Sequence, residues 1–284
     1  MKKFLAVLLM LAMLLCGAAF AEDTAPALTK DVVVLFTSDV HCGIDQGWGY
    51  AGVANMRNSL QADNHVVLVD DGDAIQGETI GTLTKGSAII ELMNAVGYDI
   101  AIPGNHEFDY GSDGLADMLN AAVSSGENLP RMVVCNVDWD AMKKAGLSEG
   151  QKQIYEEFQT YGVKDYTVIQ KGDVKIAVLG VFGKDSLDCA PTCELLFKDP
   201  SEAARETVEE IKKNEDVDMI ACVSHSGTWE DEKVSEDEIL AKNVPDIDLI
   251  VSGHTHTQLA EPILQEIPAS YPVENMGKTW EQFP

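Results

Sequence analysis

Short apolar runs, each bounded by polar residues or glycine, recur along the whole chain. They are rich in β-branched residues and are typical of buried strands. Because their apolar positions are nearly continuous rather than alternating, we expect strands that are covered on both faces. The predicted strand segments are 31–39, 65–73, 98–106, 131–138, 173–183, 218–225 and 247–256.

Helical patterns lie between these segments. Residues 52–60 carry apolar side chains at helical spacing, and residues 87–97 open with Ser87 as a candidate N-cap and end in glycine. In residues 201–217 the acids come early and the lysines late, which suits the helix dipole. The alternation of strands and helices predicts an α/β layered fold, in which residues 141–165 form an inserted helix or excursion.

Polar side chains gather where five of the predicted strands end. Five of the six histidines lie at these ends, and only His65, at the start of a strand, does not. Sites in α/β sheets form at the carboxyl ends of strands, because the loops there converge on one crevice. The strand-end residues are Asp39, His41, Asp70, Asp71, Asp73, Asn105, His106, Asp109, His225, His254 and His256.

The types of these residues favour a centre that holds two divalent metal ions. Oxygen and nitrogen ligands without clustered thiolates suit Zn, Mn, Co or Mg. In the D-x-H and H-x-H motifs, alternate residues of an extended segment face one side and can reach one ion. Two ions about 3.5–4 Å apart need a bridging carboxylate, for which Asp73 is the best candidate. Such a pair clamps a tetrahedral anion and activates a bound water molecule.

Charge narrows the classes of partner. The 284-residue chain has a formal net charge of −27 and only three arginines, Arg57, Arg131 and Arg205. Long-range repulsion therefore disfavours nucleic-acid polymers and anionic membrane surfaces as partners. An anionic small-molecule substrate would need a local positive charge, which bound cations supply.

The N-terminal residues predict export. Residues 1–21 combine a charged start, an apolar run and the small-x-small sequence that ends at Ala21. This pattern is typical of a signal peptide cleaved after Ala21, which places the mature protein in the periplasm or outside the cell. Loss of its two lysines would bring the net charge to −29. No later run is long enough to span a bilayer, so we expect no membrane association after cleavage.

The five cysteines beyond residue 21 are too few for a disulfide framework. Cys189 and Cys193 are close enough in sequence to form a disulfide in an exported protein, and a zinc site at this pair is the lesser alternative. Cys135 and Cys222 lie in apolar runs and are predicted to be buried free thiols.

The motifs occur in an order that resembles the calcineurin-like metallophosphoesterases. The series D-x-H, G-D-x-x-Q-G, G-N-H-E-F-D, S-H and G-H-x-H runs through about residues 31–260. More narrowly, it is similar to the bacterial 5′-nucleotidase and 2′,3′-cyclic phosphodiesterase branch. The resemblance implies an α/β fold that is a four-layer α/β/β/α sandwich. It also implies a dinuclear-metal phosphoester hydrolase that acts on nucleoside 5′-monophosphates or 2′,3′-cyclic nucleotides by attack of a metal-bound hydroxide.

The resemblance also assigns the metal ligands. One ion would be bound by Asp39, His41 and His256, and Asp73 would bridge both ions. Many members of the nucleotidase branch carry Gln in place of His256, whereas His is common in the wider superfamily. The second ion would be bound by Asn105, His225 and His254.

A second set of roles concerns the substrate. By resemblance, His106 is not a ligand but faces the phosphate, stabilises the transition state and helps to protonate the leaving oxygen. Asp109 would orient His106, a pairing that makes physical sense for an acid–base residue. Asn105 and His106 would both contact the substrate, and Glu107 would be structural.

The resemblance also bears on the domains. Secreted nucleotidases of this kind carry a second domain with the aromatic residues that stack on the base, yet this chain ends at Pro284, soon after His256. We therefore expect residues 22–284 to be a metallophosphoesterase catalytic domain without the C-terminal nucleotide-specificity domain. The alternative hypothesis is a truncated, weakly active metal-binding remnant of a two-domain nucleotidase.

Overall fold

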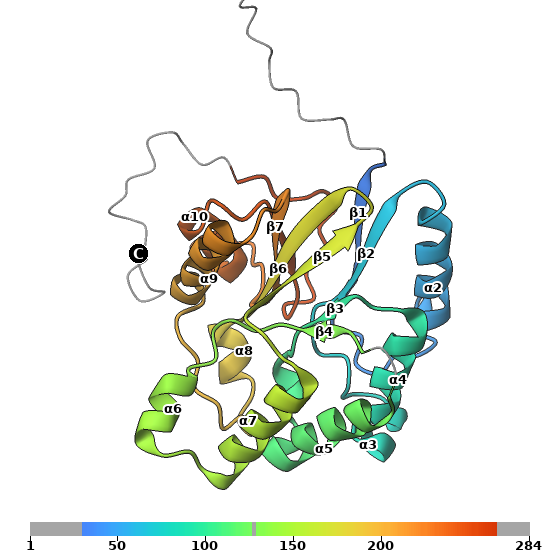
Figure 1. Ribbon diagram of the computed structural model, residues 1–284. Coiled ribbons are helices and arrows are strands. Elements are labelled where there is room, and N and C mark those ends of the chain that lie inside the picture. The colour runs from blue at the N-terminus through green and yellow to red at the C-terminus, as the bar shows by residue number, and fades with distance from the viewer. Residues whose placement is uncertain (1–29, 127–128, 266–284) are drawn as a thin grey trace, which may run out of the picture. The chain divides into compact units, whose positions relative to one another are not determined.

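The computed structural model describes residues 30–126 and 129–265, and the fold given below is that of the compact unit that begins at Asp31 (Figure 1). The predicted signal peptide, residues 1–21, lies outside the described residues. Within the described ranges, no helix combines the length and apolar character needed to cross a membrane.

The first sheet has four parallel strands that lie side by side in chain order. Its second strand is buried from Val66 onward. The side chains alternate between the two faces of the sheet, and both faces are covered. Val67 and Val69 face one core, while Leu68 between them faces another. The strands are β1 (Val32–Thr37), β2 (His65–Asp70), β3 (Ile100–Ala101) and β4 (Arg131–Met132).

The second sheet is mixed. Its first two strands form an antiparallel hairpin, and the remaining pairs are parallel. Figure 1 shows these strands in yellow and orange beside the blue strands of the first sheet. The strands lie in the order β5 (Tyr166–Lys171), β6 (Val174–Phe182), β7 (Met219–His225) and β8 (Leu249–Ser252).

Three apolar cores join four layers. Val67 and Val69 of β2 share the central core with Ile176 and Val178 of β6, so the two sheets pack face to face. The outer face of each sheet packs against helices, and Figure 1 shows α2 and α4 on one side and α9 and α10 on the other. The predicted α/β/β/α sandwich is confirmed. These four helices are α2 (Gly49–Leu60), α4 (Ser87–Val96), α9 (Pro200–Asn214) and α10 (Glu236–Asn243).

The segment 141–165 belongs to a pair of helices, rather than to the single inserted helix or excursion expected from the sequence. Ile154 and Phe158 of the second helix are buried in the same core as Leu115 of α5, so this segment extends the outer helical layer. The helices are α6 (Trp139–Ala145) and α7 (Glu149–Tyr161), and Figure 1 shows α7 beside α5 (Gly111–Ser124). The short helix α3 (Thr79–Thr84) lies near the other end of α5 in the same view.

The prediction of Ser87 as an N-cap is wrong. Ser87 is the first residue of α4, preceded by Gly86, and its hydroxyl donates a hydrogen bond to the Thr84 carbonyl oxygen. The predicted stop at Gly97 is confirmed, since Gly97 has φ 86° and its amide bonds back to the Met93 and Asn94 carbonyls.

Candidate metal centre

The predicted ligands come together from the strand ends of both sheets. Asp39 and His41 follow β1, Asp73 follows β2, and Asn105 opens the short helix η1 (Asn105–Phe108) after β3. His225 is the last residue of β7, and His254 and His256 follow β8. Residues separated by most of the chain therefore lie close together, as expected for carboxyl strand ends.

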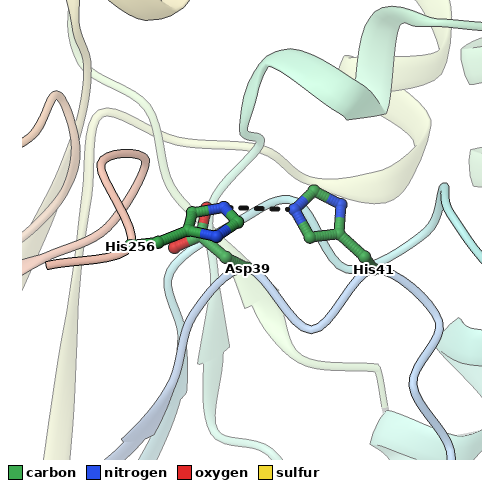
Figure 2. Close-up of side chains that lie close together, drawn as sticks. All are labelled: Asp39, His41 and His256. Atoms are coloured by element: carbon green, nitrogen blue, oxygen red, sulfur yellow. Dashed lines mark hydrogen bonds and ion pairs between the residues drawn. The ribbon is translucent and has the colours of Figure 1, made fainter. Parts of the chain in front are cut away.

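The first group comprises Asp39, His41 and His256 (Figure 2). Nε2 of His256 lies 3.4 Å from Nε2 of His41 and 3.3 Å from Oδ1 of Asp39. Figure 2 shows the two imidazole rings side by side, with the Asp39 carboxylate behind His256. Oδ1 of Asp39 is buried and takes part in no hydrogen bond, so a negatively charged ligand atom faces this group without a donated proton.

The second group surrounds Asn105. Its Oδ1 lies 3.1 Å from Nε2 of His225 and 2.9 Å from Nδ1 of His254. Nε2 of His225 is also 3.1 Å from the carboxylate of Asp73. Two imidazole nitrogens, an amide oxygen and a carboxylate thus converge on a buried point.

Three histidine rings each form a hydrogen bond through the nitrogen that points away from the centre. This arrangement fits a cation at the centre. Nδ1 of His225 lies 2.6 Å from the Asp71 carbonyl oxygen, and Nδ1 of His41 lies 3.2 Å from that of Gln76. A carbonyl oxygen only accepts, so both Nδ1 atoms donate, and in the neutral rings the Nε2 atoms would offer their lone pairs to a cation at the centre. Nε2 of His254 likewise donates to a carboxylate, 2.8 Å away, while its Nδ1 faces Oδ1 of Asn105 at 2.9 Å. This is how ligating histidines are held in metal sites.

Asp73 lies between the groups. It clusters with His41 and His106 on one side and with His225 and His254 on the other. Burial raises its pKa, but the hydrogen bond and charge of His225 outweigh burial and lower the pKa overall, so the carboxylate stays ionised. Its position is the one that a bridging ligand needs.

The backbone at the ligands is unusual. The left-handed region is costly for residues with a side chain and tends to occur at functional sites. The sequence did not reveal this feature. Five ligand candidates have positive φ: Asp39 at 53°, His41 at 48°, Asp73 at 55°, His254 at 74° and His256 at 52°.

His106 lies beside the centre. It belongs neither to the donor group around Asp39 nor to the one around Asn105. Its Nδ1 is 2.7 Å from Oδ2 of Asp109, and its ring centroid is 4.9 Å from that of His41. Burial alone would lower the pKa of His106, but the hydrogen bond to Asp109 and the negative charges of Asp73 and Glu107 raise it overall.

Glu107 holds two site loops together. Its buried carboxylate accepts hydrogen bonds from the amides of Asp73 at 2.8 Å, Ala74 at 2.9 Å, Ile75 at 3.2 Å and Gly104 at 2.5 Å. The sequence indicated a structural residue, and the structure shows that Glu107 holds the backbone of Asp73. No local sequence pattern carries this information.

Asp185 is the residue that sequence reasoning missed. It lies in α8 (Lys184–Asp188), directly after β6, and its Oδ2 accepts the 2.8 Å hydrogen bond from Nε2 of His254. The sequence did indicate this residue, because Asp185 is polar and lies just beyond the end of a buried strand.

His65 lies apart from the site, as the sequence predicted, and its Nε2 is 3.1 Å from the carboxylate of Asp173.

The cysteines separate into two kinds. Cys135 and Cys222 are buried free thiols, as predicted. Cys189 and Cys193 are also free, so the disulfide considered from the sequence is not formed in this structure. Cys189 is exposed, whereas Cys193 packs against the core beneath the first sheet.

The fold is an α/β/β/α sandwich, and two adjoining groups of oxygen and nitrogen donors lie at its strand ends. These two features are typical of α/β proteins with a dinuclear metal centre. The family model described as calcineurin-like phosphoesterase matches residues 32–258. The chain therefore belongs to the calcineurin-like phosphoesterase family.

Known relatives agree with this assignment. The chain is 31% identical over 255 residues to the trifunctional nucleotide phosphoesterase protein YfkN of Bacillus subtilis, covering 84% of this chain and 17% of that protein. It is 30% identical over 261 residues to the 5′-nucleotidase of Bos taurus, covering 85% and 41%. The crystal structure of a 5′-nucleotidase precursor from Thermus thermophilus matches with a TM-score of 0.62 and 26% identity, covering 82% and 43%. The chain spans less than half the length of these relatives.

Proposed function

We propose that this chain is a dinuclear-metal phosphoester hydrolase that acts on nucleotides. The observation that carries the proposal is the position of Asp73, which belongs to donor groups on both of its sides. A carboxylate shared by two ions is the central element of two-metal hydrolysis.

The predicted ligands are the residues that would hold the ions. Asp39, His41 and His256 would hold one, Asn105, His225 and His254 the other, with Asp73 between them. Bound there, two divalent ions supply a Lewis acid for the phosphoryl oxygens and lower the pKa of water. Their charge also attracts an anionic substrate to a strongly acidic chain.

His106 and Asp109 supply the proton chemistry of the proposal. The Nδ1 proton of His106 is donated to Asp109, so the ring is held in one orientation and Nε2 is left for the substrate. The raised pKa of His106 favours the imidazolium form. In that form Nε2 donates to a phosphoryl oxygen and passes its proton to the leaving oxygen.

The relatives support a nucleotide as the substrate class. YfkN is named a nucleotide phosphoesterase, and the Bos taurus and Thermus thermophilus proteins are named 5′-nucleotidases. We propose nucleoside 5′-monophosphates or 2′,3′-cyclic nucleotides as substrates of this chain.

We also propose that the protein is exported, because residues 1–21 have the pattern of a signal peptide. Cell fractionation of chains with and without these residues would test this.

The test combines metal exchange with one substitution. The protein is stripped with a chelator, Mn²⁺ or Zn²⁺ is added back, and hydrolysis of an aryl phosphate and of nucleotides is measured. We expect activity only with metal, and His106→Ala should lower kcat by about 10²–10⁴-fold. His65→Ala, a histidine outside the site, is the matched control and should have no effect.

Two results would contradict the proposal. Metal-independent turnover would exclude the two-metal class, and full activity of His106→Ala would remove its assigned role. The competing hypothesis, a metal-binding remnant, predicts two ions per chain by elemental analysis but no turnover of any phosphoester.

A further inference from the structure

A third cluster of metal-ligating side chains lies beside the candidate centre, where α8 and the residue that ends it meet His254. One ligand atom each from Asp185, Cys189 and His254 lies within 4.8 Å of the other two. Asp185 and Cys189 are exposed, and His254 is partly buried between them and Asn105. A carboxylate, a thiol and an imidazole at this spacing form a mixed donor set open to solvent.

The donor chemistry of this cluster differs from that of the main centre. The two main groups contain only oxygen and nitrogen donors, whereas the third offers a sulfur atom. Thiolate ligands select a soft ion such as Cd²⁺ over Mn²⁺ and Mg²⁺. The third cluster therefore favours Cd²⁺ more strongly than the two main groups do.

Cys189 is available for this role because the neighbouring cysteine is not its partner. Cys193 packs against the apolar core, while Cys189 is exposed on the side of Asp185 and His254. A cation that binds the sulfur of Cys189 displaces the thiol proton, which passes to solvent.

His254 connects the cluster to the main centre. Its Nδ1 lies 2.9 Å from Oδ1 of Asn105, and its Nε2 donates to Oδ2 of Asp185 at 2.8 Å. An ion that binds Nε2 must displace the proton there. If the neutral ring keeps its one proton, that proton moves to Nδ1, which then offers no lone pair to the main centre. One neutral imidazole cannot serve both sites in this way.

We propose that Asp185, Cys189 and His254 form an inhibitory site for a soft divalent ion, which takes His254 away from the candidate metal centre. Binding releases the thiol proton of Cys189 to solvent and moves the imidazole proton of His254 from Nε2 to Nδ1. The binding step stands on the cluster alone, and the inhibition rests on the proposed hydrolase function.

The test uses the full chain loaded with Mn²⁺ and titrated with Cd²⁺. We expect one further Cd²⁺ per chain by elemental analysis, accompanied by near-ultraviolet cadmium–thiolate absorption. Cys189→Ser should abolish this absorption and lower the Cd²⁺ affinity by at least the 10–100-fold typical of lost supporting contacts. Phosphoester hydrolysis, followed in parallel, should be inhibited in the native chain and resistant in Cys189→Ser, with basal activity unchanged.

Two matched controls make the result specific. Cys193→Ala removes the other thiol of the same loop, and Asp188→Asn removes a neighbouring exposed charge outside the cluster. Both should keep the cadmium–thiolate absorption.

Each contrary outcome has a defined meaning. No thiolate absorption in the native chain, or equal Cd²⁺ binding by Cys189→Ser, would overturn the site. Binding without inhibition would overturn the link through His254. If no variant hydrolyses a phosphoester under any condition, the proposed function fails while the binding readout still decides the site.

Discussion

The two halves of the candidate centre differ in how firmly they are held. In the half around Asn105, His225 is fully buried and Asp73 is 2% exposed, and hydrogen bonds fix the rings of His225 and His254. In the other half, the side chain of His256 is 60% exposed. One half is therefore built before any ion arrives, whereas the other depends on the ion to hold His256 in place.

This difference predicts an order of metal affinity. A rigid, buried donor set loses little conformational entropy on binding, so its ion should be held more tightly. The exposed half should exchange its ion first during dialysis against a chelator.

Asp73→Asn should damage both halves at once. The variant removes the charge that lies between the two groups and leaves the imidazole of His225 without its carboxylate partner. We expect loss of measurable phosphoester hydrolysis and a marked fall in bound metal, determined by elemental analysis. Asp117→Asn, an exposed acid on α5, is the control, and an active Asp73→Asn protein would remove the bridging role.

A paired substitution compares the halves directly. His225→Gln alters the buried half, and His256→Gln alters the exposed one, where a Gln oxygen remains able to ligate. We expect about 10–100-fold weaker metal binding for His225→Gln and a smaller loss for His256→Gln, both by metal titration. Equal losses would show that exposure does not govern affinity here.

Asp185→Asn tests the hydrogen bond that orients His254. An amide can also accept this hydrogen bond, but it lacks the charge that strengthens a bond to imidazole. We expect metal binding in the half around Asn105 to weaken by up to about tenfold, which is the smallest loss typical of a residue that supports a metal ligand. Asp185→Glu should restore part of this loss. Unchanged affinity would exclude a positioning role for Asp185.

Glu107→Gln should affect stability first. Its carboxylate accepts hydrogen bonds from four backbone amides, and a side-chain amide offers only one oxygen as an acceptor. We expect the free energy of unfolding to fall by about 1–3 kcal/mol, measured by urea denaturation of metal-free protein. Glu209→Gln, an exposed acid on α9, should leave stability unchanged.

Much of the fold could be predicted from local patterns. The near-continuous apolar runs indicated strands covered on both faces, and Leu68 between Val67 and Val69 shows why, since adjacent residues face different cores. Helix starts were less predictable, because the boundary at Ser87 depends on a backbone turn at Gly86 rather than on a capping side chain.

The candidate site was also visible in the sequence, as polar residues at strand ends. The structure brings together all seven predicted ligands: Asp39, His41, Asp73, Asn105, His225, His254 and His256. Strand ends carry that information because the chain direction alone determines which edge of a parallel sheet they reach.

The tertiary structure decided which of these residues touch one another, and how. It brought Asp185 to His254 across 69 positions, joined Glu107 to the loop of Asp73, and turned Cys189 and Cys193 to different surroundings. By itself the sequence determined the residue types and the edge at which they gather. Distances, exposure and the nitrogen that each histidine presents depend on packing between the two sheets, which no local pattern along the chain encodes.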